Sequence, residues 1–389
     1  MKIASRMENL SPSVTMAITA LGRELKAQGK DILSFSAGEP DFNTPEKIKE
    51  AAIQAIKDGH TKYTAVEGIT QTKQAIINKL KKDHDLDYKL DNIVISNGAK
   101  HSLFNLFQLL IEEGDEVIIP APYWVTYPEQ VKFSDGVPVF IDTDDTTEFK
   151  ITAEQLKAAI TPRTKVLLLN TPSNPTGAVY TKEELEAIAE VLVGTDILVF
   201  SDEMYEKIMY NGKKFTAAAQ ISDDMFQRTV TINGLSKAVA MTGWRFGYIA
   251  TPKTEIIKAM IKLQGQVTSN VNSVTQWAAI PALEGEADET IEMMRVEFEK
   301  RKNIAVESFN AIKGLSTIDP DGAFYLFINI KEVTNDSMKF CSDLLEQKGV
   351  AVVPGLAFGT EGYFRFSFAT DLASIQEGIK RIKEFVENN

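Results

Sequence analysis

The sequence is poor in the residues that build disulfide frameworks and metal centres. Its 389 residues include one cysteine, Cys341, which excludes an internal disulfide framework and fits a reducing compartment. The three histidines, His60, His84 and His101, are scattered, without cysteines or carboxylates at ligand spacing. We therefore expect neither a disulfide-stapled protein nor a dedicated metal site.

Long apolar runs are also lacking. No stretch has the length and apolarity of a membrane span, and the first residues, Met1 to Arg6, lack the apolar core of a signal peptide. The balance of 42 basic and 54 acidic residues gives a net charge of -12, which disfavours contact with nucleic acid or anionic membrane. We expect a cytoplasmic protein with no nucleic-acid or membrane partner.

The chain does contain core-forming residues, arranged in a regular order. It is 44% apolar, and from about residue 46 helical and strand patterns alternate. This alternation predicts an α/β fold with a large domain, residues 46–286, whose mostly parallel sheet is flanked by helices. From about residue 287 a long charged helix and short strands predict a smaller α+β domain. We expect residues 1–45 to join residues 287–389 in that smaller domain.

Short, β-branched, apolar runs predict strands that are covered on both faces. They span residues 92–96, 116–119, 137–141, 165–169, 197–200 and 229–232. Helices are predicted at 45–58, 69–82 and 101–111, and capping boxes at Thr152 and Thr181 mark two more helix starts. Polar residues follow several of the strands directly, at the strand ends where open α/β sheets bind ligands.

Lys237 and Arg245 follow the last of these runs and lie among small and aromatic residues. A lysine in an apolar pocket loses hydration, so its neutral amine is favoured and can attack an aldehyde. An arginine beside it suits a phosphate, because two parallel donors match two oxygens. On this pair alone, two surface charges are an equally good interpretation.

Two further segments follow strand ends. Asp202 either caps a turn or keeps the nitrogen of a heteroaromatic ring protonated, and Tyr205 could reach the same ligand. Asn174 lies in a proline-rich turn, residues 170–177, where it could donate to a phenolate oxygen. The alternative for each segment is a turn and no more.

Three more features complete the set. Gly98, Ala99 and Lys100 link a strand to a helix, and N–H groups at a helix N-terminus form an anion site. Trp124 follows a proline-rich strand end and would either join the core or stack on a flat ring. Arg365 lies within an aromatic strand, where its charge needs either a buried salt bridge or a substrate carboxylate.

In this order and spacing the motifs resemble the class I, fold-type I, pyridoxal-phosphate-dependent aminotransferases, and within them the bacterial branch of aspartate aminotransferases. The resemblance runs from residues 36–45 through 174–177 and Ser236–Lys237 to Arg365. It implies a large domain of the seven-stranded type, pyridoxal 5'-phosphate as cofactor, and a homodimer whose active sites are shared between subunits.

The resemblance also implies a role for each residue around the cofactor ring. Lys237 would hold the cofactor as a Schiff base and then carry a proton between substrate and cofactor. Asp202 would pair with the pyridine nitrogen, Tyr205 and Asn174 would hold the phenolic oxygen, and Trp124 would stack on the ring.

The phosphate would be bound by Arg245, by the backbone of Gly98, Ala99 and Lys100, and by Tyr63 of the partner subunit. Gly234 stands where some aminotransferases have a phosphate-binding serine, so that one contact is not expected here.

For the substrate, the resemblance implies that Arg365 and the backbone of Gly38 bind the α-carboxylate, beside Trp124 and Asn174. Lys100 and Thr15 match positions that bind the distal carboxylate in the aspartate branch. We therefore expect ping-pong transfer of the amino group of aspartate to 2-oxoglutarate. The alternatives are aromatic, alanine or prephenate-type substrates, a C–S or C–C lyase of the same fold, or a regulator, although no DNA-binding module is seen.

Overall fold

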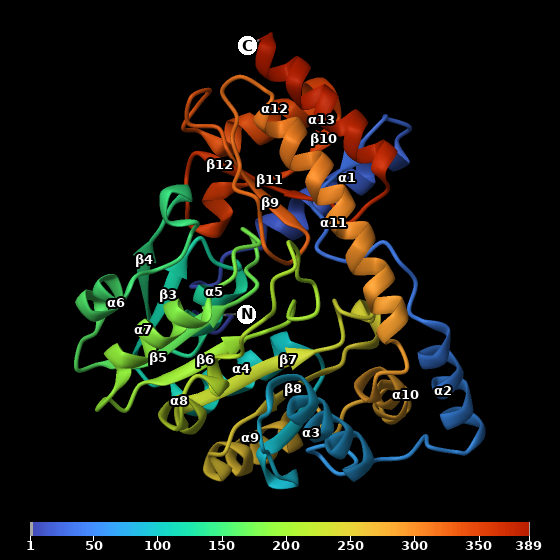
Figure 1. Cartoon of the computed structure of the whole chain (residues 1–389), viewed down its shortest axis with the longest axis vertical. Coiled ribbons are helices and arrows are strands. Elements are labelled where there is room, and N and C mark those ends of the chain that lie inside the picture. The colour runs from blue at the N-terminus through green and yellow to red at the C-terminus, as the bar shows by residue number, and fades with distance from the viewer. Residues whose placement is uncertain (1–2, 389) are drawn as a thin grey trace.

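A seven-stranded sheet fills the lower half of the molecule in Figure 1. In the computed structural model, which describes residues 3–388, its strand order is β2-β8-β7-β6-β5-β3-β4. Within this sheet β8 is antiparallel to both of its neighbours, and the other neighbouring strands are parallel. The strands are β2 (Ile93–Ser96), β3 (Glu116–Ala121), β4 (Val137–Asp142), β5 (Thr164–Asn170), β6 (Leu198–Asp202), β7 (Thr229–Gly234) and β8 (Gly247–Ala250). The predicted mostly parallel sheet is confirmed.

Two strands differ from the sequence-based expectation. β8 was not predicted, because a four-residue strand that begins with glycine gives too short an apolar pattern. β4 was predicted to be covered on both faces, and this was wrong. It is the edge strand, and Val137 and Phe140 remain 44% and 43% exposed.

Helices cover both faces of the sheet. On β5, Val166 and Leu168 pack into one core cluster and Leu167 and Leu169 into another, because successive side chains point to opposite faces. The helices of this part are α2 (Glu46–Lys57), α3 (Thr70–His84), α4 (Ala99–Leu110), α5 (Thr126–Phe133), α6 (Ala153–Ala159), α7 (Lys182–Leu192), α8 (Asp223–Arg228), α9 (Thr254–Val267) and α10 (Ser273–Glu284).

Both predicted capping boxes are present. The N–H of Glu184 donates to Thr181 Oγ1 over 3.2 Å, and the Thr181 N–H donates to the Glu184 carboxylate over 2.8 Å. Thr152 and Gln155 make the same reciprocal pair at the start of α6. α4 begins two residues earlier than predicted, because Gly98 adopts a positive φ of 87° and serves as its N-cap.

The upper part of the molecule contains segments from both ends of the chain (Figure 1). β1 (Leu33–Ser34) pairs in parallel with β10 (Val350–Ala351), and β11 (Val353–Pro354), β12 (Tyr363–Ser367) and β9 (Tyr325–Asn329) form an antiparallel sheet. The helices here are α1 (Val14–Ala27), α11 (Asp288–Asn310), α12 (Ser337–Lys348) and α13 (Leu372–Glu387). The β1–β10 pairing supports our proposal that residues 1–45 and 287–389 form one domain.

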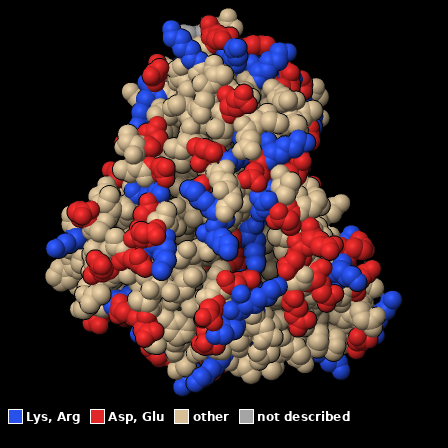
Figure 2. All heavy atoms as spheres, in the orientation of Figure 1, with Lys and Arg blue, Asp and Glu red and all other residues tan. Residues whose placement is uncertain are grey.

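Charged side chains of both signs are spread over the molecule. Figure 2 shows Lys and Arg intermixed with Asp and Glu over the face viewed. Within residues 3–388, every helix is either too short or too polar to span a bilayer.

Candidate active site

A cavity of about 330 Å³ lies where β5 and β6 end, between the sheet and the upper part of the molecule. The sequence-predicted residues that line it are Thr15, Gly38, Ala99, Lys100, Trp124, Asn174, Asp202, Tyr205, Lys237, Arg245 and Arg365. They come from segments as far apart as the start of α1 and strand β12. The fold therefore brings into one cavity residues that the sequence places up to 350 positions apart, from Thr15 to Arg365.

Lys237 lies in the long loop between β7 and β8. Its Nζ donates a hydrogen bond to the backbone oxygen of Gly38. Burial is the main cause that lowers the pKa of Lys237 to about 8; Glu39 opposes the shift, and Arg365 and Arg245 add to it. A larger fraction of this amine is therefore neutral, and nucleophilic, near neutral pH than for an exposed lysine.

Asp202 is buried at the end of β6. Tyr127 Oη donates to its Oδ2 over 2.7 Å, and the N–H of Met204 lies 3.4 Å from its Oδ1. Burial raises the pKa of Asp202 to about 6, partly offset by these two hydrogen bonds. The carboxylate thus faces the cavity and also caps the local turn through its long hydrogen bond from the Met204 N–H.

Tyr205 lies one turn further on, and its hydroxyl is 2.8 Å from that of Tyr325. Both tyrosines line the cavity. Tyr127 and Tyr325 were given no role in the sequence analysis. They contact Asp202 and Tyr205 across 75 and 120 residues, and a single sequence has no signal for pairs so far apart.

Arg245 and the start of α4 lie against each other. Arg245 Nη1 donates to Thr242 O over 2.9 Å and Nη2 to Asn97 O over 3.3 Å. A Cβ placed on Gly98 would collide with the Arg245 guanidinium, so the glycine permits this approach. Gly98 does not line the cavity itself, but Ala99 and Lys100 do, at the helix end where the first N–H groups have no helical partner. Guanidinium and helix N-terminus together favour an anion.

Gly234 has a structural reason to be glycine. A Cβ at this position would lie 2.6 Å from the backbone oxygen of Phe246, so a serine would not fit without a shift of the backbone. The close approach arises because Gly234 pairs with Gly247 across β7 and β8. The departure noted in the sequence thus follows from the packing of these two strands.

Arg365 is 2% exposed and has no carboxylate partner within the described part of the chain. Its Nη1 donates to Asn174 Oδ1 over 2.9 Å and its Nη2 to Ser36 O over 2.7 Å. It also lies over the Tyr325 ring, 4.5 Å from the centroid. The buried salt bridge considered as an alternative is therefore wrong. A buried guanidinium held only by neutral acceptors favours a carboxylate ligand.

Lys100, Trp124 and Thr15 form another part of the wall. Lys100 Nζ lies 4.8 Å from the centroid of the Trp124 ring, and burial together with Arg245 lowers the pKa of Lys100. Thr15 Oγ1 is buried, without a hydrogen-bond partner in residues 3–388. The Trp124 ring meets the Tyr127 ring edge to face, with 5.3 Å between the ring centroids. Trp124 also lines the cavity, which is consistent with stacking on a flat ligand ring.

Tyr63 does not join this cavity. It is 91% exposed, on the loop between α2 and α3. Its side chain is therefore accessible to another molecule, and its role toward a partner subunit stays a prediction.

Comparisons with known proteins agree with this geometry. The model of the family described as aminotransferase class I and II matches residues 30–382. The chain is 49% identical to an aspartate aminotransferase of Bacillus subtilis, with 100% of both chains covered. It is 46% identical to an aspartate/prephenate aminotransferase of Nitrosomonas europaea, over 98% of this chain and 99% of that one. The solved structure of the aspartate aminotransferase from Rhizobium meliloti, 42% identical, superposes with a TM-score of 0.96 and covers 100% of this chain and 99% of that one.

The seven-stranded α/β sheet, the cavity at its strand ends with a lysine and two arginines, and the matches to known proteins together identify the class of protein as a transaminase. The chain belongs to the aminotransferase class I and II family. The fold and enzyme class that the resemblance implied are confirmed.

Proposed function

We propose that this chain is a pyridoxal-phosphate-dependent aminotransferase that moves the amino group of L-aspartate to 2-oxoglutarate, giving oxaloacetate and L-glutamate. The observation that carries the proposal is the amine of Lys237, with a lowered pKa, in one cavity with Arg245 and the buried Asp202 and Arg365. The names of the Bacillus and Rhizobium relatives support aspartate as the amino donor.

The residues present fit pyridoxal phosphate. The cavity offers an amine for its aldehyde, a buried carboxylate for its ring nitrogen, and a guanidinium beside a helix N-terminus for its phosphate. Asn174 accepts from Arg365 through Oδ1, so its Nδ2 can donate to the phenolic oxygen, with the Tyr205 hydroxyl on the same cavity wall. Each polar group of the cofactor would find a partner of the opposite kind.

When bound, the cofactor supplies an aldehyde that captures the amino group and a protonated ring that withdraws electrons. Lys237 would hold the cofactor at its aldehyde carbon, and its freed amine would take the proton from the substrate Cα as general base and give it back as general acid. Asp202, held by Tyr127, would keep a proton on the ring nitrogen. Arg365 and Gly38 hold the α-carboxylate, which fixes Cα within reach of Lys237.

Aspartate carries a second carboxylate, for which we propose Lys100 and Thr15. Both line the cavity, and the Lys100 ammonium already lies against the Trp124 ring. The aspartate/prephenate name of the Nitrosomonas relative makes prephenate the alternative substrate. The matching family is described as aminotransferases, so it gives no support to the lyase and regulator alternatives.

We further propose a homodimer in which Tyr63 of the partner subunit contacts the phosphate. The proposal rests on the resemblance, and it is consistent with Tyr63 being 91% exposed and absent from the cavity lining of its own subunit. The cytoplasmic location predicted from the single cysteine is likewise a proposal.

Reduction with borohydride tests the central residue. In wild-type holoenzyme we expect a pyridoxyl adduct on Lys237, and in Lys237→Ala we expect no adduct and a loss of turnover of about four orders of magnitude or more. Lys258→Ala, which removes an exposed lysine on α9, is the matched control and should retain full activity. Near-normal turnover in Lys237→Ala would refute the assignment.

A further inference from the structure

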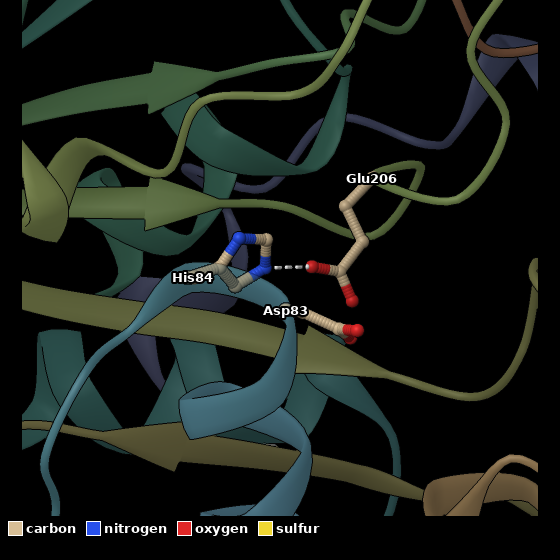
Figure 3. Close-up of side chains that lie close together, drawn as sticks. All are labelled: Asp83, His84 and Glu206. Carbon is tan, nitrogen blue, oxygen red and sulfur yellow. Dashed lines mark hydrogen bonds and ion pairs between the residues drawn. The ribbon is translucent and has the colours of Figure 1, made fainter.

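The turn segment, defined here as residues 203–207, has buried side chains on the side that faces away from the cavity. Asp202 and Tyr205 line the cavity. Glu203 and Glu206 do not line it, and they are 0% and 5% exposed. Ser201 Oγ donates to Glu203 over 2.7 Å. Figure 3 shows Glu206 pointing toward His84 and Asp83, which belong to the last turn of α3.

Glu206 is held at both of its oxygens. Its Oε2 is 2.6 Å from His84 Nε2, and its Oε1 forms an ion pair with Lys79 Nζ. The side chains of Glu206, His84 and Lys79 are 3%, 6% and 10% exposed. Burial alone would raise the pKa of Glu206, but Lys79 and His84 outweigh it, so the pKa of Glu206 lies below its ordinary value. Glu206 is thus an ionised, fixed anchor.

Asp83, on α3, also contacts Lys79 and pairs in addition with Lys207 of the turn segment. Its Oδ2 lies 3.2 Å from Lys79 Nζ and 2.8 Å from Lys207 Nζ. The sequence did not predict this cluster, because Glu206 is 122 residues from His84 and only the folded chain brings the two together.

A metal ion is not needed to explain the cluster. Asp83, His84 and Glu206 do offer ligand atoms within 4.8 Å of one another. However, the ammonium groups of Lys79 and Lys207 already occupy the cation positions, and the 2.6 Å contact of His84 with Glu206 leaves no space for an ion between them. The charges of the cluster are balanced by its own side chains.

The anchor matters because the rest of the turn segment has mostly local hydrogen bonds. The Glu203 N–H donates to Ile232 O on β7, but Glu206 N–H donates back to Glu203 O and Ile208 N–H to Tyr205 O. Two side chains tie this segment to α3: Glu206, whose contacts with Lys79 and His84 are buried, and Lys207, which is 31% exposed and pairs with Asp83. Asp202 lies immediately before the segment, and Tyr205 lies within it.

We propose that Glu206, held by Lys79 and His84, is a positioning residue that fixes Asp202 and Tyr205 in the cavity through the turn segment. The inference rests on the proposed function, in which Asp202 and Tyr205 contact the cofactor. Release of Glu206 would let both residues move relative to the cofactor ring, and so change the environment of the ring nitrogen without removing a group that touches substrate.

Two variants of equal charge test this. Glu206→Gln removes the buried tie to α3. Asp83→Asn removes a carboxylate from Lys79 and Lys207, and so loses the more exposed tie, but leaves Glu206 with Lys79 and His84. In holoenzyme of Glu206→Gln we expect kcat to fall about tenfold, with KM for aspartate changed less than about twofold. We also expect the pH midpoint of the bound cofactor's absorption band to shift by about half a unit or more. Asp83→Asn should leave both properties as in wild type.

Amide hydrogen exchange of residues 202–208 in the cofactor-free protein supplies a readout that does not depend on the reaction. We expect it to be faster in Glu206→Gln, by about tenfold or more, than in Asp83→Asn. If wild type shows no activity with aspartate, the proposed function fails, while this exchange difference still decides whether Glu206 anchors the segment. Equal exchange, absorption midpoint and kcat in the two variants would overturn the proposal.

A third variant covers the case in which Glu206→Gln does not fold. Glu206→Asp retains the charge and shortens the side chain by one methylene, so it keeps the ion pair only if the turn segment moves toward α3. We expect the same changes at about a third of the size. Wild-type kcat and absorption midpoint in Glu206→Asp would contradict a positioning role.

Discussion

Burial disfavours the charged form of the Lys237 amine, and this has a measurable consequence for cofactor capture. Because burial lowers its pKa to about 8, the neutral fraction of the amine increases with pH up to that value and then levels off. We expect the rate of pyridoxal-phosphate binding by the cofactor-free protein to rise about tenfold per pH unit below pH 8 and to level off above it. Stopped-flow absorbance measures this rate. A rate that still climbs at about pH 10 would indicate an ordinary exposed amine.

Lys100 allows a test of substrate choice at a single residue. In Lys100→Met the apolar contact with Trp124 is kept, but the cation proposed to meet the distal carboxylate is lost. We expect kcat/KM for aspartate to fall by about 30-fold, because a hydrogen bond to a charged group contributes about 1.5–3 kcal/mol. Alanine, which has no distal carboxylate, is the internal control and should change less than about threefold. Equal losses for both substrates would point to a general role of Lys100.

At this scale the sequence predicted the identity of most cavity residues but not how they are held. All the predicted residues except Gly98 and Tyr63 line one cavity. Gly98 packs against the Arg245 guanidinium, and Tyr63 is exposed. What the sequence could not predict was the Tyr127–Asp202 bond, or which of its two alternatives held for Arg365. These depend on contacts between distant segments, which only the completed fold defines.

Among the helices, α7 offers a clean test of a local sequence signal. Its capping box joins Thr181 and Glu184, neither of which lines the cavity. We expect Thr181→Ala to lower the free energy of unfolding by about 1 kcal/mol, because N–H groups at the helix start lose their acceptor. Urea denaturation measures the loss, and turnover should be unchanged. Lys182→Ala, one residue further along, is the matched control and should change stability less than about 0.5 kcal/mol.

The strands could be predicted where a short run of residues in the sequence carried the signal. Apolar runs gave β2 to β7 to within about two residues, since buried strands require them. β8 was missed because its four residues follow a long loop, and the strand order, with β8 between β2 and β7, is a property of the assembled sheet. The exposed β4 likewise depends on its place at the edge.

For the whole molecule, the proposed sharing of active sites predicts complementation between subunits. Lys237→Ala and Tyr63→Ala homodimers should each be impaired, but a hybrid dimer would contain one site with both changes and one with neither. We expect mixed refolding of the two variants to restore about a quarter of wild-type activity, since half of the dimers would be hybrids with one intact site each. The recovered turnover after refolding measures this. Activity no higher than the mean of the two homodimers would mean that each subunit builds its own site.

The loop from Gly234 to Gly247 sets the distance between Lys237 and Arg245, the two groups proposed to hold opposite ends of the cofactor. Its ends are paired across β7 and β8, and neither glycine has room for a Cβ, because Phe246 O and Ala99 N lie too close. With both ends fixed, a change of length falls on residues 235–246, which include both groups. Inserting or deleting a single residue would move the amine away from the aldehyde or the guanidinium away from the phosphate, so this stretch should tolerate altered side chains far better than an altered number of residues.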